Sequence, residues 1–240
     1  MPATGLARAL SKLGHCSRSE GVRQVLAGRV RLNGRVCRNP EQPVQLGRDR
    51  LEINGEAVIA RARAYLALNK PRGLVTTAHD EHGRDTVFSL LTDPSLPPLS
   101  PVGRLDKASE GLLLFSNDHA WAHRLTNPKS HLPKTYHVQV GGTVSNDHLA
   151  AFARGFEDAG EFLRLPVVRH LRQGDKNTWL EIVLTEGRNR QIRRVLGAFD
   201  LEVLRLVRTA IGPLSLGDLA KGQWRHLTTG EVRTLAKLKV

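Results

Sequence analysis

Five stretches of this chain have the residue pattern of β-strands, and helical stretches lie between them. The strand-like stretches are apolar throughout or alternate between polar and apolar residues, and they cover residues 65–70, 111–116, 134–140, 178–184 and 202–207. The helical stretches cover residues 119–125, 146–156 and 188–199. This order predicts an α+β fold, in which a mixed, mainly antiparallel sheet is flanked by helices.

The first thirty residues predict two short helices in tandem. Apolar residues recur at helical spacing in the first helix, namely Leu6, Leu10 and Leu13. Gly14 is placed to end this helix. Ser17 and Glu20 have the spacing of a capping box, which predicts that the second helix begins here. Its expected apolar face consists of Val22, Val25 and Leu26.

Two small hairpins are predicted after these helices. Residues 30–37 and 51–58 each hold an Asn-Gly pair between alternating residues, and both residue types tolerate the positive φ of a tight hairpin turn. Six arginines crowd the junction of the second helix and the first hairpin: Arg18, Arg23, Arg29, Arg31, Arg35 and Arg38. This clustering predicts a phosphate-binding face. The alternative is a solvated basic module without a ligand.

The charge balance also favours a polyanion as partner. The chain has 36 basic and 23 acidic residues among 240, a formal net charge of +13. No run approaches the ~18 to 20 apolar residues that cross a bilayer, and the N-terminus lacks the pattern of a signal peptide. We therefore expect a cytoplasmic protein that binds nucleic acid and has no membrane partner. Its cysteines, Cys16 and Cys37, form no CxxC pair, which predicts reduced thiols.

Asp106 is the candidate catalytic residue. It lies in the stretch "GRLDKASEGLLLFSND", residues 103–118, in a loop just before an apolar strand. A rigid strand next to the loop suits a preorganised carboxylate. A carboxylate in a partly dry pocket needs a cation to stay ionised, and four arginines lie around the start of the helix at residues 188–199: Arg188, Arg190, Arg193 and Arg194. An ordinary surface ion pair is the alternative role for Asp106.

Several motifs together resemble known families. The stretch "GHCSRSEGVRQVLAGRVRLNGRVC", within residues 4–58, is similar to the S4 RNA-binding domain. "NKPRG", "GRLDKASEGLLLFSND", "KTYHVQV" and "GRNRQIRRVL", followed by residues 203–227, resemble the RsuA-like ribosomal RNA pseudouridine synthases. The resemblance covers the whole chain. It implies an S4-like domain over residues 4–58 and a catalytic domain over residues 63–240.

The resemblance also implies roles for individual residues. Asp106 corresponds to the catalytic aspartate. Tyr136 is expected to stack on the target base and to help move the C5 proton, and Arg193 is expected to pair with the aspartate. Arg104 is expected near the RNA, where the base leaves its stack. The reaction is an isomerisation, so we expect neither a cofactor nor a metal. Covalent attack by the carboxylate and removal of the C2′ proton to form a glycal both remain open.

The expected RNA contacts extend beyond this centre. Pro71 and Gly73 fix a turn, and Lys70 and Arg72 beside them are expected to face the RNA. The predicted RNA-binding residues are Arg104, Lys70, Arg72, Arg18, Arg23, Arg29, Arg31, Arg188, Arg190 and Arg194. We expect the partner to be ribosomal RNA or an assembling ribosomal subunit. The large subunit is slightly favoured over the small one, and we expect the protein to act as a monomer.

Two other functions remain as alternatives. The first is a catalytically silent protein that binds ribosomal RNA as a ribosome assembly factor; an intact set of catalytic residues argues against it. The second is a metal-dependent RNA hydrolase that uses Asp118, His119 and His123. The two histidines are four residues apart on a predicted helix, but neither an HExxH glutamate nor a third ligand accompanies them.

Overall fold

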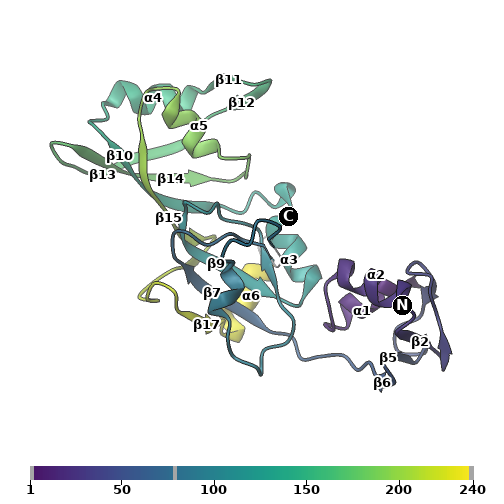
Figure 1. The fold of residues 1–240 in the computed structure, drawn as a ribbon. Helices are drawn as coiled ribbons and strands as arrows, with labels where there is room; N and C mark the ends of the chain where they lie inside the picture. Colours follow the sequence, from purple (N-terminus) through teal and green to yellow (C-terminus); the bar gives the residue numbers. More distant parts are fainter. Residues whose placement is uncertain (1–2, 78–79, 238–240) are drawn as a thin grey trace. The chain divides into compact units, whose positions relative to one another are not determined.

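The computed structural model describes residues 3–77 and 80–237. The chain forms two compact units. The first comprises Met1–Tyr65, Asp93–Ser100 and Phe115–Ala120, and the second comprises Leu66–Thr92, Pro101–Leu114 and Trp121–Val240. The ribbon colours in Figure 1 run along the sequence, so each of these segments can be located by its colour. The domain boundary between residues 58 and 63 stays a prediction.

Two helices and a small apolar core form most of the first unit. Helix α1 is Leu6–Lys12 and α2 is Arg18–Leu26, as the apolar spacing predicts. The Ser17 side chain accepts a hydrogen bond from the Glu20 backbone N–H at 3.2 Å, so it caps α2. Leu26 does not belong to the apolar face, because 56% of it is exposed. That prediction was wrong; Leu26 is the last residue of α2.

Four short strands complete this unit in the order β3-β2-β5-β6. They are β2 (Val30–Leu32), β3 (Arg35–Val36), β5 (Leu51–Ile53) and β6 (Glu56–Ala57). Both Asn-Gly pairs lie in the turns and have positive φ, 51° at Asn33 and 53° at Asn54. The two predicted hairpins are therefore confirmed, and β2 pairs with β5 to join them. A separate pair is formed by β1 (Thr4–Gly5) and β4 (Pro43–Val44).

A nine-stranded sheet is the main feature of the larger unit. Its principal order is β13-β14-β10-β15-β9-β7-β17. These strands are Val167–Gln173, Asn177–Leu184, Lys134–Gly141, Val203–Ile211, Glu110–Ser116, Tyr65–Lys70 and Trp224–His226. Strand β8 (Ser100–Val102) pairs with β9, and β16 (Leu214–Ser215) pairs with β15. The β10 pairings are antiparallel and the β15–β9 pairing is parallel, which confirms the predicted mixed sheet.

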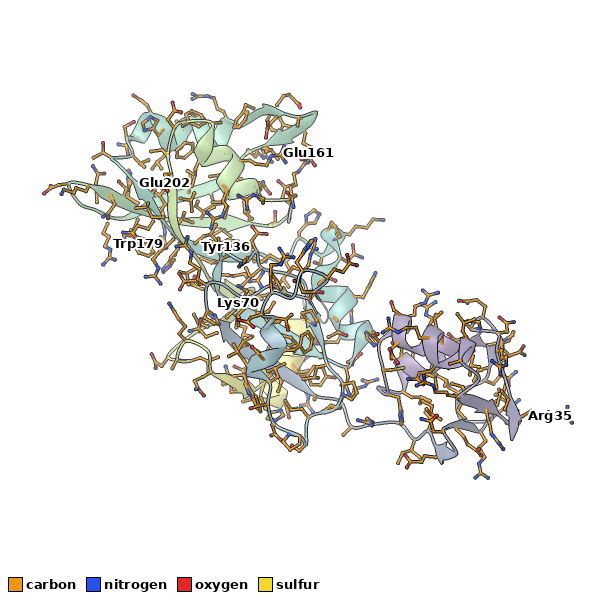
Figure 2. The ribbon with its side chains drawn as sticks, in the orientation of Figure 1. Arg35, Lys70, Tyr136, Glu161, Trp179 and Glu202 are labelled. Atoms are coloured by element: carbon orange, nitrogen blue, oxygen red, sulfur yellow. The ribbon has the colours of Figure 1, made fainter. Side chains whose placement is uncertain are left out.

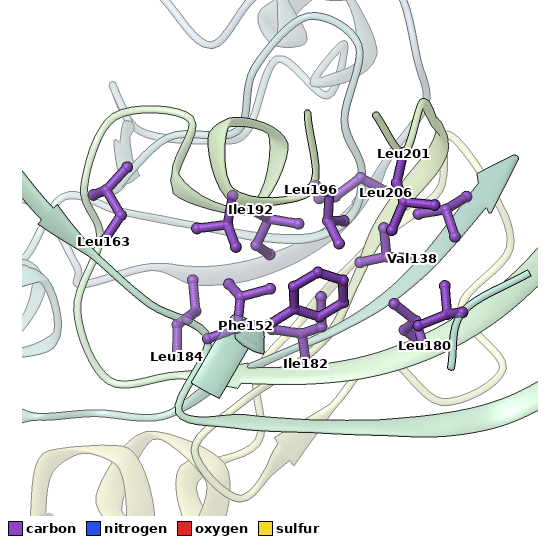
Figure 3. Packing of buried hydrophobic residues seen from close by; sticks show 14 residues of the cluster. Val138, Phe152, Leu163, Leu180, Ile182, Leu184, Ile192, Leu196, Leu201 and Leu206 are labelled. Carbon is purple, nitrogen blue, oxygen red and sulfur yellow. The ribbon is translucent and has the colours of Figure 1, made fainter. Parts of the chain in front are cut away.

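Helices α4 (Asn146–Arg154) and α5 (Gln191–Gly197) lie over the same face of β13, β14 and β10 (Figure 1). Ile192 and Leu196 of α5 face Phe152 of α4 and Ile182 of β14 across a buried core (Figure 3). Helix α5 is shorter than the predicted 188–199, because Arg190 has φ 50° and lies just before the helix.

The remaining elements are short. They are α3 (His119–Thr126), α6 (Thr229–Lys237), the 3₁₀ turns Val87–Leu90 and Pro128–Ser130, and the hairpin of β11 (Phe156–Asp158) and β12 (Glu161–Leu163). This hairpin, strands β8, β13, β16 and β17 of the large sheet, and helix α6 were not predicted. Among the residues described, no helix combines the length and the apolar character needed to cross a bilayer.

Candidate active site

The loop between β8 and β9 carries Asp106, and hydrogen bonds from other segments fix its backbone. The Thr76 hydroxyl donates to the Leu105 carbonyl at 2.7 Å and accepts from the Leu105 N–H at 3.3 Å. The Gly73 N–H donates to the Lys107 carbonyl at 2.8 Å. The residues on both sides of Asp106 are therefore hydrogen-bonded to the segment that follows β7.

Lys70, the last residue of β7, anchors the same loop from beneath. Its side chain is fully buried. Its Nζ donates to the carbonyls of Pro71, Asp106 and Ser109 at 3.0, 3.2 and 2.8 Å. Burial lowers the pKa of Lys70 to about 8, although Glu110 and Asp106 act in the opposite direction. The predicted RNA contact of Lys70 was wrong, because a phosphate cannot reach a buried ammonium whose donors are used within the protein.

The Asp106 carboxylate itself remains accessible, with 44% of the side chain exposed. Its ion pair among the described residues is with Arg190, whose Nη1 lies 3.9 Å from Oδ2. Arg193 instead donates to the carbonyls of Ala108 and Val203, at 3.2 and 3.4 Å. The structure thus places Arg190, rather than the expected Arg193, against the carboxylate. The cause is local, since Arg190 precedes α5 in a left-handed conformation.

Arg193 is nevertheless part of the electrostatic environment of Asp106. Burial is the largest cause that lowers the pKa of Arg193, and the positive charges of Arg190 and Arg72 lower it further. The negative charge of Asp106 raises it. Its Nε is buried without a hydrogen-bond partner among the described residues. Arg193 therefore fixes the Ala108 carbonyl two residues from Asp106 and contributes positive charge to the site.

Asp106 opens into a cavity of about 720 Å³. Tyr136 of β10 lines this cavity, half-buried, and packs against the core beneath α5. Figure 2 labels Tyr136 and Lys70. Arg104, Arg188, Arg190 and Arg193 also line the cavity. Its apolar lining includes Leu114, Leu125, Leu184, Leu206 and Ile211. An aromatic ring, apolar walls and the accessible carboxylate of Asp106 suit a nucleobase and its sugar.

Arg194 does not belong to this cavity. Its side chain forms ion pairs with Asp158 and Glu161, at 2.6 and 2.5 Å, and Glu161 lies on the β11–β12 hairpin (Figure 2). The RNA contact of Arg194 stays a prediction; in this structure two acids from an unpredicted hairpin occupy its donors. Arg188 pairs with Glu186 at 3.1 Å and still lines the cavity.

The arginines of the first unit are exposed, as a phosphate-binding face requires. Arg18 has an ion pair with Glu41 at 3.5 Å, and Arg23 has one with Glu20. Arg29 donates to the Gln24 side chain at 3.4 Å. Exposed pairs of this kind contribute little to stability and exchange readily for phosphate contacts. The RNA-binding role of Arg18, Arg23, Arg29 and Arg31 stays a prediction.

Sequence reasoning missed three residues that build the site. Thr76 holds the loop that carries Asp106, and Lys134 and Arg208 line the cavity beside Tyr136. The position of Lys134, two residues before Tyr136 on the same strand, was a usable signal, because such residues share one face. Thr76 and Arg208 carry no local signal, since tertiary contacts give them their positions.

Comparison with known proteins accounts for this arrangement. Residues 64–198 match the model for RNA pseudouridylate synthases, and residues 4–49 match the S4 domain. The chain belongs to the RNA pseudouridine synthase family. The RsuA-like resemblance is thereby confirmed, and the chain is an isomerase that acts on RNA.

Full-length relatives agree with this family assignment. An uncharacterized RNA pseudouridine synthase of Aquifex aeolicus is 40% identical over 95% of this chain and 92% of its own length. Ribosomal large subunit pseudouridine synthase B of Bacillus subtilis is 34% identical over 97% of this chain and 96% of its own. A crystal structure of a pseudouridylate synthase superposes with a TM-score of 0.67 at 29% identity, covering 97% of this chain and 99% of that one. This synthase therefore has family relatives along at least 95% of its length.

The buried Lys70 gives this synthase a testable pH dependence. Above pH 8 the folded chain has released a proton that the unfolded chain keeps up to the ordinary lysine pKa of 10.5. The free energy of unfolding should therefore rise with pH in this window, by up to about 1.4 kcal/mol per pH unit. Lys70→Met should lack this rise. Urea unfolding of both proteins at several pH values between 7.5 and 9.5 measures it.

The same variant should also slow the reaction. Without the ammonium, three loop carbonyls lose their donor, and a misplaced carboxylate reduces the rate by about 10- to 100-fold. RNA affinity should stay the same, because Lys70 is buried. Parallel pH dependences of unfolding in wild type and variant, or an unchanged rate, contradict the anchoring role.

Proposed function

We propose that this enzyme converts one uridine of ribosomal RNA to pseudouridine, with Asp106 as the catalytic carboxylate and without a cofactor. The observation that carries the proposal is the placement of Asp106: its loop is held by Lys70, Thr76 and Gly73, while its carboxylate stays accessible in the cavity that Tyr136 lines. The large-subunit RNA is the favoured substrate, because the Bacillus subtilis relative carries that name.

The residues fit the bond changes of this reaction. The N1–C1′ bond breaks, the uracil turns, C5 bonds to C1′, and C5 then loses its proton. A single carboxylate serves by attacking the sugar carbon or by taking the C2′ proton. Because a stacked base hides its glycosidic bond, the uridine must first flip out, at an expense of a few kcal/mol, roughly. Stacking on Tyr136 returns ~1 to 3 kcal/mol.

The arginines around the cavity and on the S4-like domain bind the RNA. Arg104, Arg188 and Arg190 line the cavity with the catalytic carboxylate, and Arg72 lies close enough to affect Arg193. We assign residues 4–58 to the S4-like domain and residues 63–240 to the catalytic domain. Folded ribosomal RNA is recognised by its shape, which its phosphate backbone presents, and by bases that have left their stack. Both domains therefore contribute phosphate contacts.

Salt should weaken RNA binding steeply. If roughly six to eight phosphates are contacted, the affinity falls by about three orders of magnitude or more between about 50 and 200 mM salt. Filter binding or fluorescence anisotropy with an rRNA fragment across this range measures the slope. A flat dependence removes the RNA-binding role of the arginines.

Tritium release tests the proposed substrate. Large- and small-subunit rRNA are transcribed separately with uridine tritiated at C5, and the enzyme is added with a chelator present. We expect a single equivalent of tritium from the large-subunit RNA and none from the small-subunit RNA. Release from the small-subunit RNA alone overturns the subunit assignment. Absence of release from both RNAs and from assembling particles overturns the enzymatic function in favour of an assembly factor.

A further inference from the structure

Arg208 of β15 is a buried cation in the wall of the catalytic cavity. Only 5% of the residue is exposed, and it lines the cavity. Its Nε donates to the Leu112 carbonyl at 2.8 Å, which fixes the guanidinium against β9. Its Nη2 is buried without a hydrogen-bond partner among the described residues. An unpaired buried donor on a cation is strongly unfavourable, so this atom points to a ligand.

A second cation lies next to it. Lys134 of β10 lines the same cavity, and burial together with the charge of Arg208 lowers the Lys134 pKa. Among the described residues, no acidic side chain forms an ion pair with either Lys134 or Arg208. Two neighbouring cations without an acid repel each other. Negative charge on a bound substrate removes that repulsion.

The sheet register places both cations beside Tyr136. Arg208 is the cross-strand partner of Tyr136, and Lys134 precedes Tyr136 by two residues on β10. Directly paired residues, and residues two apart on a strand, share one face of the sheet. The three side chains therefore project together into the cavity. Leu184, Leu206 and Ile211 surround them with apolar surface.

The backbone of Arg208 is held in place by a close approach of two strands. Gly111 of β9 pairs with Arg208 in the parallel ladder. A Cβ at residue 111 would lie 2.3 Å from the Arg208 carbonyl oxygen and 2.8 Å from its nitrogen, so only glycine allows this distance. The position of the guanidinium is thus built into the fold.

We propose that Arg208, with Lys134 beside it, binds a carbonyl oxygen of the flipped uracil and stabilises the negative charge on this base after it leaves the ribose. The inference rests on the proposed uridine isomerisation. A base that stacks on Tyr136 presents its edge to groups on the same face. Phosphates, in contrast, meet the exposed arginines such as Arg104 and Arg190. The depth and the apolar surroundings of Arg208 therefore favour the base over the phosphodiester.

The charge follows from the bond changes. When the N1–C1′ bond breaks, its electron pair leaves with the uracil and is shared among N1, O2 and O4. The sugar compensates by bonding C1′ to an Asp106 oxygen, or by forming a C1′–C2′ double bond as the C2′ proton goes to Asp106. The base is anionic on either route. When C5 bonds to C1′, either the C1′–O bond to Asp106 breaks or the proton on Asp106 returns to C2′, so Asp106 is a free carboxylate again. C5 then releases its proton and N1 takes up a proton, so the product is neutral.

Arg208→Ala and Arg208→Lys test this role by single-turnover tritium release at saturating RNA, with RNA affinity measured separately. We expect the alanine variant to lose about 100-fold or more in rate, with a Kd within about threefold of wild type. Guanidinium chloride at tens of millimolar should recover at least about a tenth of the rate that Arg208→Ala loses. The reference is the rate in potassium chloride at the same concentration. Arg169→Met is the matched control, because Arg169 is exposed and pairs with Glu181 outside the cavity.

Each outcome decides the question. A rate loss at saturation with guanidinium rescue supports the proposal, and a rate loss that guanidinium does not rescue overturns it. An unchanged rate at saturation with a weaker Kd assigns Arg208 to a phosphate, and an unchanged rate and Kd remove it from the site; both overturn the proposal. If Arg208→Ala does not fold, Lys134→Met and Arg208→Lys provide the same comparison. If the proposed function itself fails, the result is different from all of these, because the wild-type enzyme then releases no tritium.

Discussion

Asp106→Asn is expected to reduce pseudouridine formation by at least about 10⁴-fold, with RNA binding unchanged. The amide keeps the shape of the side chain but neither attacks the sugar nor takes up a proton. Folding should be unaffected, because 44% of the Asp106 side chain is exposed and its ion pair with Arg190 is at 3.9 Å. Single-turnover tritium release measures the rate, and anisotropy with the same RNA measures the affinity.

Asp175→Asn is the matched control for this variant. Asp175 is an exposed acid in the turn between β13 and β14, and the cavity lining does not include it. This control should react at the wild-type rate. A rate for Asp106→Asn within about tenfold of wild type is incompatible with a catalytic carboxylate at this position.

Gly111→Ala is expected to lower the free energy of unfolding by about 4 kcal/mol or more, or to prevent folding. Gly111 has φ 100°, where an L side chain is strained, and the new Cβ would lie 2.3 Å from the Arg208 carbonyl oxygen. The clash is with backbone, so a rotamer change cannot relieve it. Strands β9 and β15 would have to separate at the point where they hold the cavity.

Gly142→Ala separates the steric clash from the backbone strain. Gly142 also has positive φ, 80°, but a Cβ there meets nothing within 4 Å. It should lose only about 1 to 2 kcal/mol in the same urea unfolding experiment. Equal losses for the two variants show that the approach of β9 to β15 does not require glycine.

The fold was predictable where the signal was local. Apolar runs and alternation predicted β7, β9, β10, β14 and β15, and two Asn-Gly pairs predicted the hairpins of the first unit. The β11–β12 hairpin was missed, and with it the ion pairs that its acids form with Arg194. Residues 158 and 161 are more than thirty positions from Arg194 in the sequence, so no local pattern connects them with it.

The candidate site divides in the same way. Motif resemblance indicated Asp106 and Tyr136, and the structure brings both to one cavity. Lys70 was misassigned because a lysine beside Pro and Gly is typical of an exposed turn, whereas its burial depends on carbonyls of a loop about 36 residues later. Arg208 was missed because its anchor, Leu112, is separated from it by 96 positions. Contacts between segments that are far apart in the sequence therefore determine the positions of Lys70 and Arg208.

Chromatography of nucleosides from reacted ribosomal RNA tests the proposed reaction most directly. The large-subunit RNA is incubated with wild type or Asp106→Asn, digested to nucleosides and analysed for pseudouridine. We expect the wild type to convert a single uridine to pseudouridine, without a change in RNA mass, and Asp106→Asn to yield none. Equal pseudouridine from both proteins, or none from the wild type on either rRNA or on assembling particles, contradicts isomerisation by Asp106.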